Sequence, residues 1–495
     1  MAKLHINVNK KLSVINKNIY GHFAEHLGRG IYDGIFVGQD SPIPNIRGIR
    51  TDVLNALKHI NVPVIRWPGG CFAEYYNWKD GIGPKRKKMV NSGWGGVIEN
   101  NAFGTHEYFD LCELLECSTY IAANVGSGTP REVSEWVEYI TFDGESEQSD
   151  LRRSHGRDKP WTLDFIGIGN ENWGCGGHMR PEYYSDLYRQ FETFIRHYGN
   201  KKIQRVACGP DGDDQNWTDT VMQLAGHRMD GISLHYYTMP GYYSTDKYKW
   251  ESKSSATAFD EHNYYRTLDR AYFMDELIVR HKRIMDKYDP DGKVALIVDE
   301  WGTWHLAEEG TNPAFLYQQN TMRDAIVAGL SLNIFNLHSD RVTMANLAQM
   351  INVLQSLILT EGDQIVLTPT YHVFDLYKGH HNSTLVDSLL EADDLQVNEA
   401  KLPHLHVSAS EKQDGSIHLT IVNLSAHDDV QLHTHLEGRS FSTAKLRYIS
   451  GAITDHNTFE QPERITIQTA EPLEINNNEL TIKISPCSVY EVILT

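Results

Sequence analysis

Several common functional motifs are missing from this sequence, and each absence removes a class of function. It has no GxxxxGK[ST] loop and no GxGxxG turn that opens a helix, so nucleotide-dependent chemistry has no support. It also has no HExxH and no CxxC pair, so neither a zinc peptidase nor a structural zinc site is indicated. No apolar run approaches the roughly 18 residues of a membrane-spanning helix.

Positive charge is scarce as well. There are 46 Lys and Arg against 65 Asp and Glu, a net charge of −19, and a field of this sign repels phosphate backbones and anionic lipid head groups. Neither nucleic acid nor a membrane is therefore an expected partner. Six cysteines scattered over 495 residues favour buried free thiols over a disulfide framework. The first ten residues lack the apolar core of a signal peptide, so we expect a cytoplasmic protein.

The larger part of the chain predicts a parallel α/β barrel. Over residues 18–378, short apolar runs alternate with amphipathic segments, as is typical of βα units around a parallel sheet. Helical spacing is clear in Pro181–Tyr198, Asp275–Tyr288 and Asn320–Leu330. The strand candidates are Ile19–His26, Val62–Gly70, Tyr120–Val125, Leu163–Glu171, Arg205–Gly209, Gly231–Tyr237, Val294–Trp301 and Leu332–His338. Eight such runs predict a closed (β/α)8 TIM barrel.

The remainder of the chain predicts an antiparallel, jelly-roll-like β-sandwich. After residue 378, short alternating runs are separated by turn residues such as Asp414-Gly415. Leu4–Val8 leaves little room for a helix before the first barrel strand, so we expect it to pair into the same sandwich. The expected domains are a catalytic barrel over 18–378 and a sandwich formed by 1–17 together with 379–495.

Two of the predicted barrel strands end in a glutamate. The motifs IGIGNEN and LIVDEWG place Glu171 and Glu300 where the C-terminal ends of barrel strands meet at one mouth. A glycosidase needs one protonated carboxyl to assist the leaving oxygen and one ionised carboxylate to attack the anomeric carbon. Asn170 offers an amide for a sugar hydroxyl, and Trp301 and Trp304 offer flat apolar faces for sugar rings. These contexts favour catalysis over a structural role for the pair.

Longer motifs make the interpretation more specific. Besides GNENW (169–173) and DEWG (299–302), the motifs YGHFAEH (20–26), RWPGGCFA (66–73), NWKDGIG (77–83), LHYY (234–237) and MANLAQ (344–349) resemble glycoside hydrolase family 51, the α-L-arabinofuranosidases. The resemblance covers essentially the whole chain. It implies a retaining double displacement with Glu171 as general acid/base and Glu300 as nucleophile, and it implies neither a cofactor nor a metal.

The resemblance also implies which side chains surround the bound furanose. Arg66 would hydrogen-bond Glu300 and keep it ionised. Tyr237 would donate its phenol to the same carboxylate, and His235 would orient Glu171 or a sugar hydroxyl. Each group also has a plain structural interpretation, as an ion pair, a packed core side chain or a surface group. The full set is Glu25, Arg66, Asn170, His235, Tyr237 and Gln349.

Cysteine and tryptophan side chains complete the predicted site. Cys71 stands where some family members carry asparagine, so the contact of that amide with a hydroxyl would come from a thiol or from the backbone. Cys175 follows Glu171 by four residues, and we expect the two sulfurs to be able to bridge if their Cα atoms lie within about 7 Å. Trp94, on a glycine-flanked loop, and Trp304 are expected to shape the pocket.

The expected activity is exo-acting removal of terminal non-reducing α-L-arabinofuranosyl residues from arabinoxylo- or arabino-oligosaccharides. Another retaining barrel glycosidase, such as a β-xylosidase or an endoglucanase, remains an alternative because two glutamates do not identify the sugar. A carbohydrate-binding protein without catalysis is a weaker alternative, since both glutamates are present. The family resemblance further implies a homo-oligomer, a hexamer built from dimers or trimers.

Overall fold

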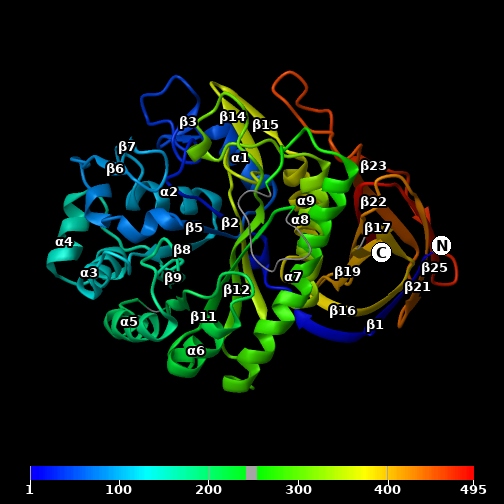
Figure 1. Cartoon of the computed structure of the whole chain (residues 1–495), viewed down its shortest axis with the longest axis horizontal. Coiled ribbons are helices and arrows are strands. Elements are labelled where there is room, and N and C mark those ends of the chain that lie inside the picture. The colour runs from blue at the N-terminus through cyan, green and yellow to red at the C-terminus, as the bar shows by residue number, and fades with distance from the viewer. Residues whose placement is uncertain (1, 200, 241–252, 398–399) are drawn as a thin grey trace.

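A closed barrel of eight parallel strands forms the larger part of the molecule (Figure 1). The computed structural model describes residues 2–199, 201–240, 253–397 and 400–495. The barrel strands are β2 (Gly21–Phe23), β5 (Val64–Trp67), β8 (Ser118–Ala123), β9 (Phe165–Ile168), β10 (Gln204–Ala207), β11 (Gly231–Thr238), β12 (Ala295–Thr303) and β13 (Val342–Leu347). This confirms the predicted TIM-barrel class.

The eighth predicted strand is wrong. Leu332–His338 lies at the end of helix α8 (Met322–Leu337), and the eighth strand is β13. Every residue of α8 from Met322 to Asn336 is buried, because the helix packs against the barrel on one side and against β19, β20 and β26 on the other. A helix buried on all sides has no polar stripe, so its periodicity cannot be told from that of a buried strand.

The outer helices largely follow the predicted pattern. Helix α5 (Pro181–Phe194) begins at the proline but ends four residues before the predicted Tyr198, and α7 (Glu261–Tyr288) begins well before Asp275. The other helices are α1 (Thr51–His59), α2 (Thr105–Leu115), α3 (Pro130–Thr141), α4 (Glu147–Ser154), α6 (Gln215–Ala225) and α9 (Pro369–Tyr377). In Figure 1, α7, α8 and α9 stand between the barrel and the second sheet. No helix in the described ranges is long and apolar enough to cross a bilayer.

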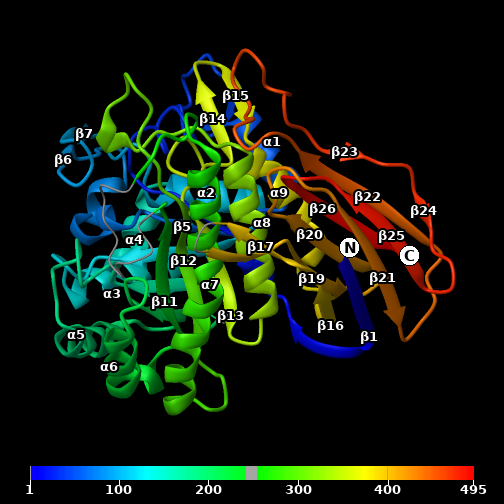
Figure 2. The same ribbon diagram turned by 45° about the vertical axis from the view of Figure 1, so that its right-hand side comes forward.

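The second sheet has ten strands and curves around its own apolar core (Figure 2). Its pairing path is β23-β22-β26-β20-β19-β16-β1-β21-β25, with β24 on β22. The strands are β1 (Ala2–Val14), β16 (Thr384–Glu391), β19 (Leu405–Glu411), β20 (Ile417–Asn423), β21 (Val430–Glu437), β22 (Thr443–Ser450), β23 (Gln468–Thr469), β24 (Leu473–Glu474), β25 (Glu479–Ile484) and β26 (Ser488–Leu494).

The N-terminal strand does pair into this sheet, as predicted. β1 lies antiparallel to β16 and parallel to β21, so it holds an interior position between two strands that follow the whole barrel in the chain. The β1–β21 pair is the parallel exception in an otherwise antiparallel path among the described strands.

Four two-stranded hairpins lie outside these two sheets in the described part of the chain. They are β3 (Asn45–Ile46) with β4 (Ile49–Arg50), β6 (Met89–Asn91) with β7 (Val97–Glu99), β14 (Ile358–Glu361) with β15 (Gln364–Leu367), and β17 (Asp394–Val397) with β18 (Ala400–Pro403). The β6–β7 hairpin matters for the site because its connecting loop carries Trp94.

Candidate active site

The predicted site residues gather at the C-terminal ends of the barrel strands, around a cavity of about 730 Å³. Parallel strands deliver their following loops to the same end of the barrel, so residues far apart in sequence meet there. Nine of the predicted residues line the cavity wall: Glu25, Cys71, Trp94, Glu171, His235, Tyr237, Glu300, Trp304 and Gln349. Arg66 and Asn170 are buried just beneath it and contact the residues of the wall.

Glu300 is held by two donors and is nearly buried. It belongs to β12, and its side chain is 6% exposed. Arg66 Nη1 donates to Oε1 at 2.9 Å, and Tyr237 Oη donates to Oε2 at 2.8 Å. A guanidinium and a phenol both stabilise the ionised carboxylate. The arrangement therefore fixes the orientation of the Glu300 carboxylate, as a nucleophile requires.

Gly70, in the turn after β5, lets the backbone come close to this carboxylate. A Cβ atom at Gly70 would lie 2.6 Å from Glu300 Oε1, closer than nonbonded atoms can approach. A Cβ at this position would therefore push the Glu300 carboxylate from the place in which Arg66 and Tyr237 hold it.

His235 connects the second glutamate to a buried aspartate. Its Nδ1 lies 2.9 Å from Glu171 Oε1 and its Nε2 lies 3.0 Å from Asp299 Oδ1. Burial alone would lower the pKa of His235, but the carboxylates of Glu300, Asp299 and Glu171 raise it well above its usual value. A protonated imidazole donates from both nitrogens, which suits acceptors on both sides.

Glu171 occupies an environment different from that of Glu300. Burial raises its pKa; the hydrogen bond with His235 limits the rise, and the charge of Glu300 adds to it. Glu171 therefore keeps its proton to a higher pH than an exposed glutamate does, which is the property of a general acid. An oxygen of Glu171 lies within 4.8 Å of an oxygen of Glu300, so both carboxyls face one small volume.

The turn that carries Glu171 is fixed by a residue that sequence reasoning missed. Glu171 has a φ of 43°, which an L-residue adopts only where the surroundings enforce it. Buried Glu74 supplies that enforcement: it accepts bonds from Asn170 N and Asn172 Nδ2 beside Glu171, and from the backbone of β8's following loop. Burial raises the pKa of Glu74 to about 7 against these hydrogen bonds.

Asp299 and Tyr120 are also functional candidates that the sequence did not reveal. Asp299 lies 3.4 Å from Arg66 Nε and accepts a 2.6 Å bond from Tyr120 Oη. Although burial would raise the pKa of Asp299, Arg66 and His235 hold it below its usual range. Ideal strand alternation would turn Asp299 away from the side of Glu300, but β12 has a register shift between Val298 and Trp301, and such bulges redirect side chains.

Glu25, Gln349 and Trp94 form a second hydrogen-bonded group in the wall. Glu25 Oε1 accepts from the backbone of Gly70 and Phe72 and, at 3.1 Å, from Trp94 Nε1, while Oε2 accepts from Gln349 Nε2 at 3.0 Å. Burial and then the charge of Glu300 raise the pKa of Glu25 to about 7. The Trp94 loop is thereby fastened to the barrel mouth through Glu25.

The two tryptophans near Glu300 have different surroundings. Trp304 lines the cavity edge-on to Tyr237, with ring centroids 4.9 Å apart, and Lys253 Nζ lies 4.1 Å from its ring centroid. Trp301 does not offer a face to a sugar, contrary to the expectation. It is 1% exposed and packs against Phe335 of α8, because it points outward from β12 toward the helix layer.

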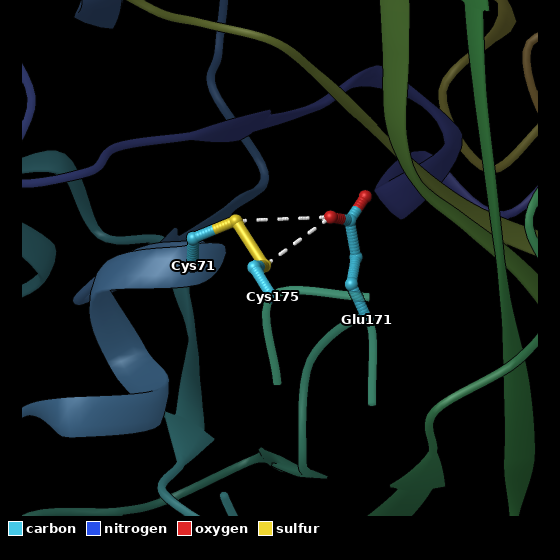
Figure 3. Close-up of side chains that lie close together, drawn as sticks. All are labelled: Cys71, Glu171 and Cys175. Atoms are coloured by element: carbon cyan, nitrogen blue, oxygen red, sulfur yellow. Dashed lines mark hydrogen bonds between the residues drawn. A yellow bond between two sulfur atoms is a disulfide. The ribbon is translucent and has the colours of Figure 1, made fainter. Parts of the chain in front are cut away.

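Cys71 and Cys175 form a disulfide at the rim of the cavity (Figure 3). Their Cα atoms are 5.6 Å apart, inside the limit expected for a bridge. The link joins η2 (Cys71–Tyr75), which follows β5, to the loop after Glu171. Cys112, Cys117, Cys208 and Cys487 are free thiols, so the general expectation of free cysteines holds for four of the six.

Among the residues that the structure describes, two groups of side chains have the spacing that a metal ion needs. One is Glu171, His235 and Glu300, and the other is Cys71, Glu171 and Cys175. In the first set Glu300 is hydrogen-bonded to Arg66 and Tyr237, and His235 lies between Glu171 and Asp299. In the second set both sulfurs are in the disulfide. Neither is required for the acid/base and nucleophile chemistry described above.

Comparison with known proteins gives one consistent result. The family model described as "Alpha-L-arabinofuranosidase 1 domain" matches residues 56–257, and "Alpha-L-arabinofuranosidase C-terminal domain" matches residues 299–488. An intracellular exo-alpha-L-arabinofuranosidase of Bacteroides ovatus is 47% identical over 492 residues, 99% of this chain and 94% of that protein.

Comparison with solved structures gives the same result as the comparison of sequences. The GH51 arabinofuranosidase from Xanthomonas axonopodis pv. citri superposes with a TM-score of 0.96 at 44% identity, covering 100% of this chain and 99% of that one. The arabinose complex of the α-L-arabinofuranosidase from Thermotoga maritima superposes with a TM-score of 0.87 at 30% identity, again covering 100% and 99%.

Proposed function

The chain belongs to glycoside hydrolase family 51, the α-L-arabinofuranosidases, and from that premise we propose how its cavity works. It hydrolyses terminal non-reducing α-L-arabinofuranosyl residues of arabino- or arabinoxylo-oligosaccharides by double displacement. The observation that carries this proposal is the approach of Glu171 and Glu300 to within 4.8 Å, oxygen to oxygen. Retaining glycosidases keep their carboxyl groups about 5–5.5 Å apart, whereas inverting enzymes need about 6.5–9.5 Å to admit a water.

In the first step Glu300 attacks C1 of the arabinofuranosyl unit. Arg66 and Tyr237 hydrogen-bond the two carboxylate oxygens and orient them. At the same time Glu171 passes its proton to the departing glycosidic oxygen, so that the leaving group departs as a neutral alcohol. The product of this step is a covalent arabinosyl ester on Glu300 and an ionised Glu171.

In the second step Glu171 acts as a general base instead of a general acid. Ionised Glu171 removes a proton from a water that attacks C1, and Glu300 leaves. His235 lies against Glu171 Oε1, and its imidazolium stabilises the carboxylate during the interval between the two steps. Inversion at each displacement restores the original anomeric configuration.

The remaining wall residues are proposed to bind the sugar. Glu25 and Gln349 present paired acceptors and donors for hydroxyl groups, and Trp94 and Trp304 supply apolar faces. Asn170, held by Arg66 and by Glu74, is placed to reach a hydroxyl next to the reacting carbon. Cys71 contributes a sulfur in disulfide form, rather than a thiol, to the rim.

Turnover of two aryl glycosides tests the sugar specificity. Aryl α-L-arabinofuranoside should be hydrolysed much faster than aryl β-D-xyloside, and a preference for the xyloside would instead assign the site to a β-xylosidase. The first product seen by NMR should keep its anomeric configuration. Digestion of defined arabinoxylo-oligosaccharides should release arabinose alone, and cleavage inside the xylan backbone would contradict the exo mode.

Cellular setting and assembly are part of the same proposal. The relative from Bacteroides ovatus is named as intracellular, which supports a cytoplasmic enzyme acting on imported oligosaccharides. A homo-oligomer, a hexamer by family resemblance, is proposed as the assembly, and light scattering at several protein concentrations tests it: a monomer would contradict the proposal.

A further inference from the structure

The disulfide lies against the carboxyl proposed to carry the catalytic proton. Cys71 Sγ is 3.8 Å and Cys175 Sγ is 3.4 Å from the same atom, Glu171 Oε2, as the dashed lines in Figure 3 mark. The other oxygen, Oε1, is taken by His235. Since a disulfide sulfur carries no proton, neither sulfur can donate to Oε2. In the oxidised protein Oε2 is therefore the oxygen that is free to exchange a proton with substrate.

The disulfide is also accessible. Cys175 is exposed, and both cysteines line the cavity that opens to solvent. Disulfides are rare in a reducing compartment, and those that form there are usually transient catalytic bonds or redox sensors. A small reductant can therefore reach the disulfide. A change in its redox state would directly affect Glu171, whose Oε2 atom is in contact with both sulfurs.

We propose that reduction of the Cys71–Cys175 disulfide opens a binding site for a thiophilic divalent cation such as Zn²⁺, held by the two thiolates and Glu171, and that the bound cation silences Glu171. This inference rests on the proposed role of Glu171 as acid/base. A cation on Oε2 occupies the lone pair that would take up or release the catalytic proton, so catalysis stops while the rest of the site stays intact.

The distances fit a tetrahedral zinc site. With Zn–S bonds of about 2.3 Å and Zn–O bonds of about 2.1 Å, sulfur and oxygen ligands lie about 3.6 Å apart. The present separations of 3.8 and 3.4 Å are already near this value. The sulfurs themselves must move apart to about 3.8 Å, and we expect rotation of the exposed Cys175 side chain to provide this movement.

The surroundings resemble those of an open metal site rather than a closed one. His235 holds Oε1 of the carboxylate, and Asp299 holds the far side of the imidazole, an outer support of the kind that orients metal ligands. The fourth coordination position faces the cavity, where water can fill it. Asn170 Nδ2 lies 3.9 Å from Cys175 Sγ and can donate to a thiolate there.

The redox and proton balance is simple. A phosphine reductant breaks the S–S bond, gives its electron pair to the sulfurs and leaves as the phosphine oxide, with water supplying the oxygen and two protons. The two thiols then lose their protons to solvent when the cation binds. Reoxidation after removal of the cation restores the bridge and consumes a two-electron oxidant such as an oxidised thiol.

The main test compares oxidised and reduced enzyme with one equivalent of Zn²⁺, after removal of the phosphine under nitrogen. On an oligosaccharide substrate the reduced enzyme should lose about 10²-fold or more in kcat, the contribution of general acid–base catalysis, and a chelator should restore it. The oxidised enzyme should keep its rate. Equal inhibition of both forms would overturn the proposal and assign the cation to Glu171, His235 and Glu300.

A second readout does not depend on turnover. Titration of the reduced enzyme with Cd²⁺ should give ultraviolet thiolate-to-cadmium absorption that saturates at one equivalent, and Cys175→Ser should lose it. Absorption retained in this variant would place the cation at Cys112 and Cys117 of α2 and its following turn and would overturn the proposal. An oxidised enzyme without arabinofuranosidase activity would refute the proposed function instead, while the cadmium signal would still decide whether the metal site exists.

Discussion

Glu171 Oε1 and His235 Nδ1 lie 2.9 Å apart, close enough for the two groups to titrate as a pair. The imidazolium of His235 donates to Oε1 both when Oε2 carries the catalytic proton and when Glu171 is ionised, and in the ionised state the bond joins two opposite charges. The loss of the catalytic proton in the first step is thereby met by a partner that needs no rearrangement.

Glu171→Ala should separate the two catalytic steps. On an aryl arabinofuranoside with a good leaving group, the first step needs no proton and should survive, whereas the second lacks its base. Pre-steady-state kinetics should therefore show a burst followed by turnover reduced about 10²–10⁴-fold. Glu300→Ala should show neither burst nor turnover. Reversed behaviour of the two variants would exchange the roles assigned to them.

His235→Asn should move the alkaline limb of the kcat/KM profile to higher pH. In the native protein the His235 hydrogen bond lowers the pKa of Glu171 against the effect of burial. Loss of a charge-assisted hydrogen bond corresponds to roughly one to two pH units. Tyr237→Phe, which alters a contact of Glu300 and not of Glu171, should leave this limb in place. An alkaline limb that stays fixed or falls in His235→Asn would count against the pairing.

Gly70→Ala should impair catalysis more than folding. The added methyl would meet Glu300 Oε1 at 2.6 Å and push the nucleophile from its position, and a shift of about 1 Å can lower the rate about 10²-fold. Gly199→Ala is the matched control, since a Cβ there meets no atom within 4 Å. Measuring kcat together with the unfolding midpoint separates the two effects, and a Gly70→Ala enzyme with native kcat would show that Glu300 has room to move.

Glu74→Gln should flatten the pH dependence of stability. The native protein holds the pKa of Glu74 at about 7, above its ordinary value of 4.5, so the folded state binds more protons than the unfolded state between these values. The free energy of unfolding therefore falls as pH rises through this window, by about 3 kcal/mol at most from this group. Glutamine does not titrate and lacks this loss.

Denaturant unfolding of both proteins at pH 5 and pH 8 checks the Glu74 prediction. The variant is expected to be less stable at pH 5, because its amide meets backbone donors, and the deficit should shrink at pH 8. A deficit that grows with pH would mean that Glu74 is ionised throughout and stabilises the fold as a carboxylate.

Much of the site could be read from strand ends. Glu171, Arg66, His235 and Glu300 stand where apolar runs stop, and a barrel brings such positions together whatever their separation in the chain. Asp299 was not predicted as a site residue, because regular strand alternation would point its side chain away from the side of Glu300. The register shift in β12 turns it inward. Glu74 was not predicted either, because its hydrogen-bond donors lie in the loops after β8 and β9. No local sequence pattern links these loops to Glu74.

The fold was predictable to the same degree. The amphipathic helices and most of the short strands were predicted, and so was the first half of α8, as the helix Asn320–Leu330. The second half of α8 was taken for a strand, because the helix is covered by the barrel on one side and by the second sheet on the other. A helix shows a periodic pattern of apolar and polar residues only when one of its faces is exposed to water. A helix segment that is buried on all sides has no such pattern. Trp301 was expected to offer a flat face to a sugar ring, but it is a core residue because it packs against Phe335 of α8.

The interior place of β1 has a consequence for biosynthesis. A ribosome releases this strand before any of the barrel, yet its hydrogen-bonding neighbours β16 and β21 emerge only after the whole barrel has been made. Throughout that interval the apolar face of β1 (Ala2, Leu4, Ile6 and Val8) and its backbone hydrogen-bonding groups have no partner strand, so this segment is open to binding by a chaperone or to pairing with another chain.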